Sequence, residues 1–347
     1  MQETARLVRY KIFLFFITFL ISINTSAQVY PDKVIDSLLR SGINQIVNQH
    51  YDSAEKIFNK LNNDYPNLPL GKIYLAANKI AETYDYAKEF DEEFILNKLE
   101  SAKDQAEKLL KKDQSNIWYR YFYALAEGYI SYFEAINGSW LSALSSGVSS
   151  ISEFEKILTI KQNFFEAYIA IGTFEYWKSR KMEFMDWLPF ASDTKNTGID
   201  LLVIATDSAT YNTYLAMNSL IWIYIDQERY NDAISVAEKA LKEFPDSRTF
   251  KWGLARAYEE KNPSMAIQLY KEILVSYPSS VTNNNKNIIT LKHLIAQQYA
   301  KIGDRKNALK YCEEILSIKN LPQEDDSELG ERIERVKSLK KELSKSN

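Results

Sequence analysis

Apolar residues recur every three or four positions from residue 32 to the last segment of the chain, and short polar turns interrupt them. This spacing predicts amphipathic α-helices, because residues three and four apart share one face of a helix. The turns are short enough for consecutive helices to pair as antiparallel hairpins. In chain order, we predict helices at 32–48, 52–63, 68–89, 91–112, 116–136, 139–160, 164–179, 197–207, 211–226, 231–243, 247–260, 263–276, 286–301, 305–317 and 327–343.

Residues 1–27 have the layout of a secretory signal peptide. Basic residues within 6–11 precede an apolar run at 12–23, and small residues then lead to a cleavage site between Ala27 and Gln28. The run is shorter than the roughly 20 residues that span a bilayer. We therefore expect an exported chain, periplasmic or secreted, with no membrane span after cleavage. The alternative is an uncleaved segment that tethers the protein to the membrane.

A turn of fixed form recurs inside this helical pattern. In the clearest copy, residues 230–233 read Tyr-Asn-Asp-Ala, and Pro245 follows the alanine by twelve residues. A small residue allows two helices to cross closely, and a proline ends the second helix. Further copies are centred on Ala54, Ala266 and Ala308.

These residues resemble the tetratricopeptide repeat family, with clear repeats at about 38–66, 217–245, 250–278 and 291–320. Residues 68–210 form irregular hairpins within a repeat domain over 28–322, and 323–347 form a capping helix and tail. The chain also resembles secreted repeat proteins of Gram-negative bacteria. The resemblance implies an all-α fold, a right-handed superhelix (solenoid) of about seven stacked hairpins. We expect an open stack with a concave groove, not a closed toroid.

Composition narrows the possible functions. The 347 residues carry a net charge of −3, which becomes −5 once the +2 of residues 1–27 is removed. An acidic chain without a basic stripe is a poor match for nucleic acid. His50, His293 and Cys312 are too few for a usual metal site, and common nucleotide, hydrolase and metalloprotease motifs are absent from the sequence. We expect no cofactor, no metal and no catalytic residue.

An enzymatic alternative rests on carboxylates near tryptophans. Glycosidases use two carboxylates across a sugar-binding cleft, and tryptophans can serve as sugar platforms. The candidates are Glu134, Glu175, Asp186 and Asp226, near Trp140, Trp177, Trp187 and Trp222. Charge on helix ends beside core aromatics is the interpretation that we favour.

The phase of the helix at 211–226 predicts a binding groove. If Leu220, Ile221 and Tyr224 pack inward, then Asn218, Trp222 and Asp226 face the groove. The same phase in the other helices adds Tyr123, Glu127, Ile169, Thr173, Tyr176, Trp177, Trp252, Arg256, His293 and Gln297. Tryptophans along one wall suit a peptide or a partner helix.

The connection at 181–196 is long for a helix pair and contains Phe184, Trp187 and Phe190. We expect it to pack down and close one end of the groove. The predicted function is therefore a non-enzymatic adaptor or assembly scaffold of the cell envelope that binds a protein or peptide. A glycan-binding or glycan-cleaving envelope protein and a membrane-tethered assembly factor are the alternatives.

Overall fold

The computed structural model describes residues 28–182, 193–278, 285–319 and 327–345, and within these ranges it is built of helices without strands. Every predicted helix is present, with ends shifted by a few residues at most, so the prediction of an all-α fold is confirmed. The helices are α2 (Lys33–Val47), α3 (Tyr51–Asp64), α4 (Leu70–Asp85), α5 (Glu92–Lys112), α6 (Ile117–Ile136), α7 (Trp140–Ile160), α8 (Phe165–Met182), α9 (Lys195–Ser208), α10 (Thr213–Asp226), α11 (Tyr230–Glu243), α12 (Arg248–Lys261), α13 (Pro263–Ser276), α14 (Asn285–Lys301), α15 (Arg305–Leu316) and α16 (Ser327–Lys345).

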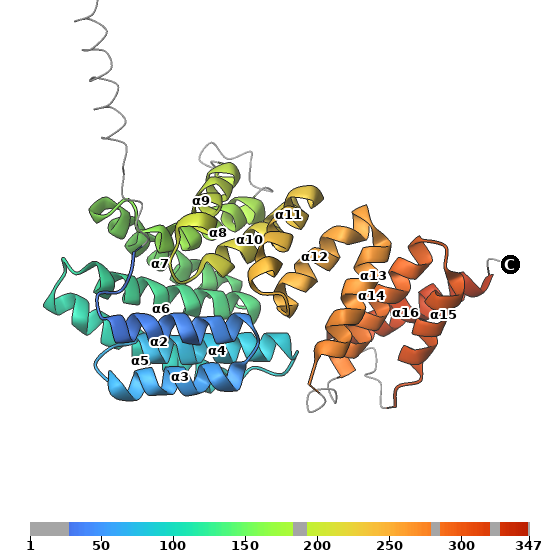
Figure 1. The fold of residues 1–347 in the computed structure, drawn as a ribbon, viewed down its shortest axis with the longest axis horizontal. Coiled ribbons are helices and arrows are strands. Elements are labelled where there is room, and N and C mark those ends of the chain that lie inside the picture. The colour runs from blue at the N-terminus through green and yellow to red at the C-terminus, as the bar shows by residue number, and fades with distance from the viewer. Residues whose placement is uncertain (1–27, 183–192, 279–284, 320–326, 346–347) are drawn as a thin grey trace, which may run out of the picture.

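Consecutive helices pair into hairpins 1 to 7, which run from α2 and α3 to α14 and α15, and α16 packs on the last pair. In Figure 1 the hairpins follow one another across the molecule, with α2–α7 at one end and α13–α16 at the other. Within the described residues, no helix is long and apolar enough to cross a membrane.

Small residues set the distance between paired helices. In hairpin 1, the Phe58 ring lies where a Cβ on Gly42 would be, and Phe58 and Ala54 are fully buried. In hairpin 5, Ala233, Ala237 and Ala240 are likewise fully buried. The recurring alanines are therefore packing positions, since interiors packed at crystal-like density leave no room for a larger side chain.

The end of α4 differs from the prediction, which extended this helix to residue 89. Ala87 has a φ of 49°, and the N–H of Lys88 donates to the carbonyl oxygen of Thr83 at 3.0 Å. A left-handed residue with this bond ends a helix. The helix stops at Asp85, which leaves Asp85 and Tyr86 at a corner of the chain.

Distant hairpins of the stack also meet, which the repeat pattern alone does not predict. In a simple solenoid each repeat contacts only its neighbours. Here hairpins 1 and 2 also contact hairpins 6 and 7, through hydrogen bonds between residues 163 to 202 positions apart. The superhelix thus returns on itself. The long loop that was expected to close the groove, with Phe184, Trp187 and Phe190, lies outside the described residues, as do residues 1–27.

Candidate binding recess and the polar clasp beside it

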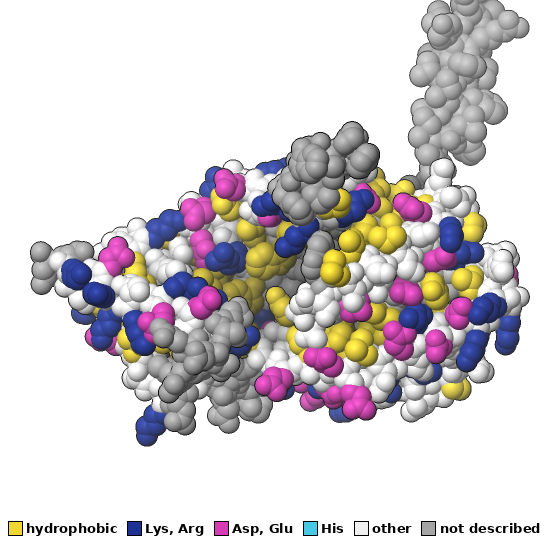
Figure 2. Space-filling model, turned by 180° about the vertical axis from the view of Figure 1, so that it is seen from behind, with side chains coloured by type: hydrophobic (Ala, Val, Ile, Leu, Met, Phe, Trp, Pro, Cys, Tyr) yellow, Lys and Arg dark blue, Asp and Glu magenta, His cyan; other side chains and the backbone are white. Residues whose placement is uncertain are grey.

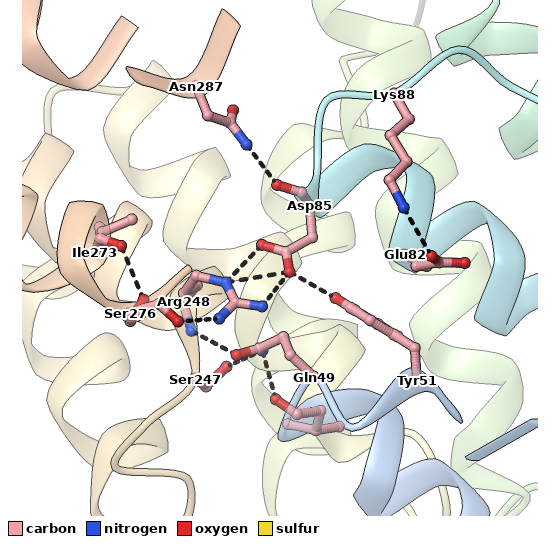
Figure 3. A network of polar contacts seen from close by, with 11 residues as sticks. Gln49, Tyr51, Glu82, Asp85, Lys88, Ser247, Arg248, Ile273, Ser276 and Asn287 are labelled. Carbon is pink, nitrogen blue, oxygen red and sulfur yellow. Dashed lines mark hydrogen bonds and ion pairs between the residues drawn. The ribbon is translucent and has the colours of Figure 1, made fainter. Parts of the chain in front are cut away.

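The contact between the two ends of the superhelix is a buried polar network, which we name the polar clasp: Gln49, Asp85, Ser247, Arg248 and Asn287 (Figure 3). The guanidinium of Arg248 binds both carboxylate oxygens of Asp85, with Nε at 2.9 and 3.1 Å. The Gln49 side chain accepts from the Arg248 backbone N–H at 3.0 Å and donates to Ser247 at 3.1 Å. Asn287 donates to the carbonyl oxygen of Asp85 at 2.9 Å.

Tyrosine rings enclose the ion pair of the clasp. Arg248 lies over the ring of Tyr277 at 4.8 Å and over that of Tyr86 at 5.7 Å. The hydroxyl of Tyr51 donates to Asp85 at 3.1 Å. Burial, and next the charge of Asp85, raises the pKa of Tyr51 well above its ordinary value, so this hydroxyl remains a donor.

A second contact joins the start of the chain to the connection between α9 and α10. The hydroxyl of Tyr211 donates to Asp36 at 2.5 Å and accepts from the backbone N–H of Tyr30 at 2.8 Å. Arg40 donates to the carbonyl oxygen of Thr210 at 3.4 Å and lies over the Tyr211 ring. Hairpin 1 is therefore held at both ends by residues far away in the sequence.

Glu166 fixes the connection that receives hairpin 1. This carboxylate is buried and accepts the backbone N–H groups of Thr210 and Tyr211, both at 2.7 Å. It also accepts from the Asn212 side chain at 2.7 Å. Burial raises the pKa of Glu166, and the three donors oppose this shift. The carboxylate has all its partners within the fold, so its role is structural.

Near the contacts of Glu166, four tyrosines of α4, α6 and α10 form a surface that we name the tyrosine recess: Tyr84, Tyr129, Tyr132 and Tyr214. Tyr132 is 48% exposed, yet burial raises its pKa to about 12, with a smaller contribution from Tyr84. The exposed fraction and the raised pKa agree for a ring that has protein around it and water in contact with it. Burial also raises the pKa of Tyr129 and of Tyr214.

The recess continues along α10. Tyr214, Asn218 and Trp222 are four residues apart, so they follow one side of the helix. All three are partly exposed. The Oδ1 atom of Asn218 is buried without a hydrogen-bond partner among the described residues, which is costly unless a ligand or water fills the place. Figure 2 shows hydrophobic side chains gathered around a hollow in the middle of the rear face of the molecule.

The structure places Tyr123 and Glu127 elsewhere. The Tyr123 hydroxyl donates to Glu127 at 3.2 Å, and Glu127 faces Lys103 of α5 at 3.9 Å. Both residues lie on the side of α6 toward α5, away from Tyr129. The phase carried over from residues 211–226 does not hold for the longer helix α6.

Several other predicted groove residues lie in the core. Ile169 is 7% exposed and Tyr176 is fully buried. Tyr176 donates to Asp226 at 2.6 Å, and Asp226 also pairs with Arg180 at 2.8 Å. Trp177 packs edge-on against Tyr176 at 5.1 Å. These contacts join α8 to α10. The Tyr176 hydroxyl and the Asp226 carboxylate therefore already have partners within the fold.

The remaining predicted residues are dispersed over three helices. Thr173 donates to Ser219 at 3.0 Å, which places it between α8 and α10. The Trp252 ring packs edge-on against the Tyr270 ring, with the two ring centroids 5.5 Å apart.

On α12, Arg256 pairs with Glu259 at 2.7 Å. On α14, His293 is 2% exposed and Gln297 is exposed. Burial, and next the charges of Arg332 and Arg335 on α16, lower the pKa of His293. Of the predicted set, only Asn218 and Trp222 lie along the line that continues from the tyrosine recess.

The carboxylates of the glycosidase alternative are already engaged. Glu134 accepts from Ser146 at 3.0 Å, and Glu175 pairs with Lys178 at 2.6 Å. Asp226 is held by Tyr176 and Arg180, as above. Asp186 lies outside the described residues. The described candidates therefore do not form a free pair across a cleft.

Sequence reasoning missed the tyrosines of α4 and α6. The segment at 117–133 is dense in aromatic residues, but their spacing does not show which of them stay exposed. Tyr121 and Phe122 do lie in the core, whereas Tyr132 does not. The exposed Tyr132 differs from the buried Tyr121 and Phe122 through the place of α10 relative to α6. The sequence does not reveal that placement.

The fold defines a helical-repeat protein built of stacked antiparallel hairpins. Two segments match family models described as tetratricopeptide repeat, residues 36–68 and residues 219–281. The chain therefore contains tetratricopeptide repeats in these two segments. No curated protein matches the chain in sequence.

Among solved structures, the chain is similar to PilW, described as a widely conserved type IV pilus biogenesis factor, at 16% identity over 76% of this chain and 96% of that chain, with a TM-score of 0.48. The APC/C hetero-tetramer Cut9–Hcn1 matches at 16% identity over 87% of this chain and 48% of that chain, with a TM-score of 0.49. The C-terminal part of a repeat-containing protein from Cytophaga hutchinsonii matches at 17% identity over 82% and 97%, with a TM-score of 0.42. The family assignment rests on the two repeat matches alone.

Proposed function

We propose that this protein is a non-enzymatic adaptor that holds a segment of a partner protein in the tyrosine recess. The observation that carries the proposal is Tyr132, which is 48% exposed within a crowded part of the molecule. Exposed aromatic rings in a recess supply contact area at little cost in conformational entropy, and tyrosine is enriched among the residues that dominate protein interfaces.

The chemistry of the surface indicates the kind of segment. The hydroxyls of Tyr129, Tyr132 and Tyr214 carry no charge at neutral pH, since burial raises their pKa further above the ordinary tyrosine value. The Asn218 oxygen can accept one hydrogen bond. An extended peptide with an apolar or aromatic anchor and a free backbone N–H fits this surface better than a charged ligand.

The place of action belongs to the same proposal. Residues 1–27 support export, with cleavage between Ala27 and Gln28, to the periplasm or the medium. The N-terminal residue of the protein recovered from cells tests this. A chain that begins at Gln28 supports export and cleavage, whereas an intact N-terminus in the membrane fraction supports a tethered protein.

The binding proposal is tested by photo-crosslinking in cells. A photoreactive phenylalanine replaces Tyr132 or Trp222 in turn, and the same residue at Val275, which is 81% exposed on α13, serves as the control. We expect one protein adduct from both recess positions and none from Val275. The same adducts from all three positions, or none from the recess, would overturn the proposal. Failure would direct attention to glycan binding, which mass spectrometry of bound sugar can detect.

A further inference from the structure

The polar clasp has a composition that differs from the contacts within each hairpin. Its members are an ion pair, two amides and a hydroxyl, and Gln49, Ser247 and Arg248 are 8% exposed or less. A buried ion pair adds little net stability compared with apolar packing, because both charges lose their hydration. Surfaces that are polar and small permit relative motion more readily than large apolar ones.

Apolar packing between neighbouring hairpins runs along the whole stack, because one core cluster contains buried residues of hairpins 1 to 7, and smaller clusters add to it. Ile80 and Leu99 of hairpin 2 share a cluster with Ile130 and Phe133 of hairpin 3. At the other end, a separate cluster joins hairpin 7 to α16 through Ile289, Ala296, Cys312, Ile315 and Val336. Losing the clasp would therefore leave the packing between neighbouring hairpins in place.

We propose that the polar clasp is a reversible latch, which releases hairpins 1 and 2 from hairpins 6 and 7 and converts the closed superhelix into an open one. The inference rests on the clasp geometry and holds whether or not the recess binds a peptide. The Asp85 carboxylate is the centre of the latch, since Arg248 and Tyr51 both bind its oxygens. Replacing it by an amide removes the charge and retains the shape.

The first experiment measures the distance between the two ends in solution. Spin labels are attached at Lys56 on α3 and Lys306 on α15, both exposed, through cysteines in a Cys312→Ser background. Asp85→Asn is compared with Glu153→Gln, which breaks the partly buried Arg120–Glu153 pair within hairpin 3. We expect double electron–electron resonance to show a new, longer distance in Asp85→Asn only, with unchanged helix content.

The unchanged distance distribution in a folded Asp85→Asn protein would overturn the latch and make the clasp a purely structural contact. So would a longer distance in Glu153→Gln as well, because the effect would then not depend on the clasp.

A second measurement uses the unmodified protein and does not depend on any variant folding. The backbone N–H of Arg248 donates to Gln49 across the clasp, whereas that of Tyr211 donates to Glu166 within hairpins 4 and 5. Amide hydrogen exchange should be at least tenfold faster at Arg248 than at Tyr211 if the latch opens on its own. Equal exchange at the two amides would mean that the clasp breaks only on wider unfolding, and the proposal would fail.

Discussion

Gly172 and Gly198 face each other where α8 crosses α9. A Cβ on Gly172 would lie 2.7 Å from the carbonyl oxygen of Gly198, and one on Gly198 would lie 2.6 Å from the carbonyl oxygen of Gly172. Backbone atoms cannot yield as a flexible side chain does. Hairpin 4 therefore depends on two glycines in contact, in a segment where the repeat pattern of the sequence is degenerate.

Substitution at this crossing should destabilise the protein. We expect Gly172→Ala to lower the free energy of unfolding by about 1–3 kcal/mol, the usual cost of overpacking. Urea denaturation followed by circular dichroism measures this. Gly128→Ala is the control, because its Cβ would meet only the Ser150 hydroxyl at 3.1 Å. Equal losses in the two variants would contradict this account of the crossing.

His293 should make stability depend on pH. Burial, with the charges of Arg332 and Arg335, lowers its pKa to about 4 from an ordinary 6.5. The folded state therefore binds this proton less readily than the unfolded state. The contribution is fully present above pH 6.5 and is lost as the pH falls toward 4, by roughly 3 kcal/mol.

Urea midpoints at pH 7 and pH 4.5 for the wild type and for His293→Leu measure this effect. The drop between the two pH values should be smaller in His293→Leu than in the wild type. His50→Leu, which changes an exposed side chain, should leave the drop as it is. An unchanged drop in His293→Leu would show that other groups cause the pH dependence.

Glu166 should be a costly residue to remove. Glu166→Ala leaves the backbone N–H groups of Thr210 and Tyr211, and the amide of Asn212, without their acceptor. We expect a loss of about 2–4 kcal/mol in the free energy of unfolding, since buried unpaired donors cost about 1–3 kcal/mol each and part of the site can relax. Glu155→Ala, on the exposed side of α7, should change it by less than about 0.5 kcal/mol. Similar losses in the two would contradict the role given to Glu166.

Substitution of the tryptophans of α10 and α12 should change stability by different amounts. Trp252 packs edge-on against the buried ring of Tyr270, so Trp252→Ala should cost about 3 kcal/mol or more of stability. Trp222 belongs to the partly exposed side of α10, and Trp222→Ala should cost less than about 1 kcal/mol while weakening partner binding. Thermal unfolding of both variants measures the two losses of stability. A large loss for Trp222→Ala would place that ring in the core.

The helices and their pairing could be predicted because they depend on local signals. The spacing of apolar residues, the alanines near the turns and Pro245 act over a few residues. The candidate site residues could be predicted less well, because the direction of each side chain depends on the exact phase of its helix. Asn218 lies on the helix from which the phase was taken, whereas Tyr123 lies on a longer helix where the same phase turns it toward α5.

The closure could not be predicted from local signals. Asp85 ends an ordinary helix and Arg248 begins another, and nothing in their immediate sequence links them. Their meeting depends on the small rotation between successive hairpins, summed over the intervening part of the chain. An error of a few degrees at each step would leave the two residues far apart.

The clasp also sets an order of events in time. If the protein folds as it is made, hairpins 1 and 2 are complete long before Arg248 exists, since 163 residues separate it from Asp85. At about 5–20 residues per second, this interval is roughly ten to thirty seconds. During that time Gln49 and Asp85 lack their partners from hairpins 6 and 7 and keep only the bonds to Val47 and Tyr51 of hairpin 1. The polar groups of hairpins 1 and 2 are thus exposed to water the longest. Their contacts are completed only when hairpins 6 and 7 have formed.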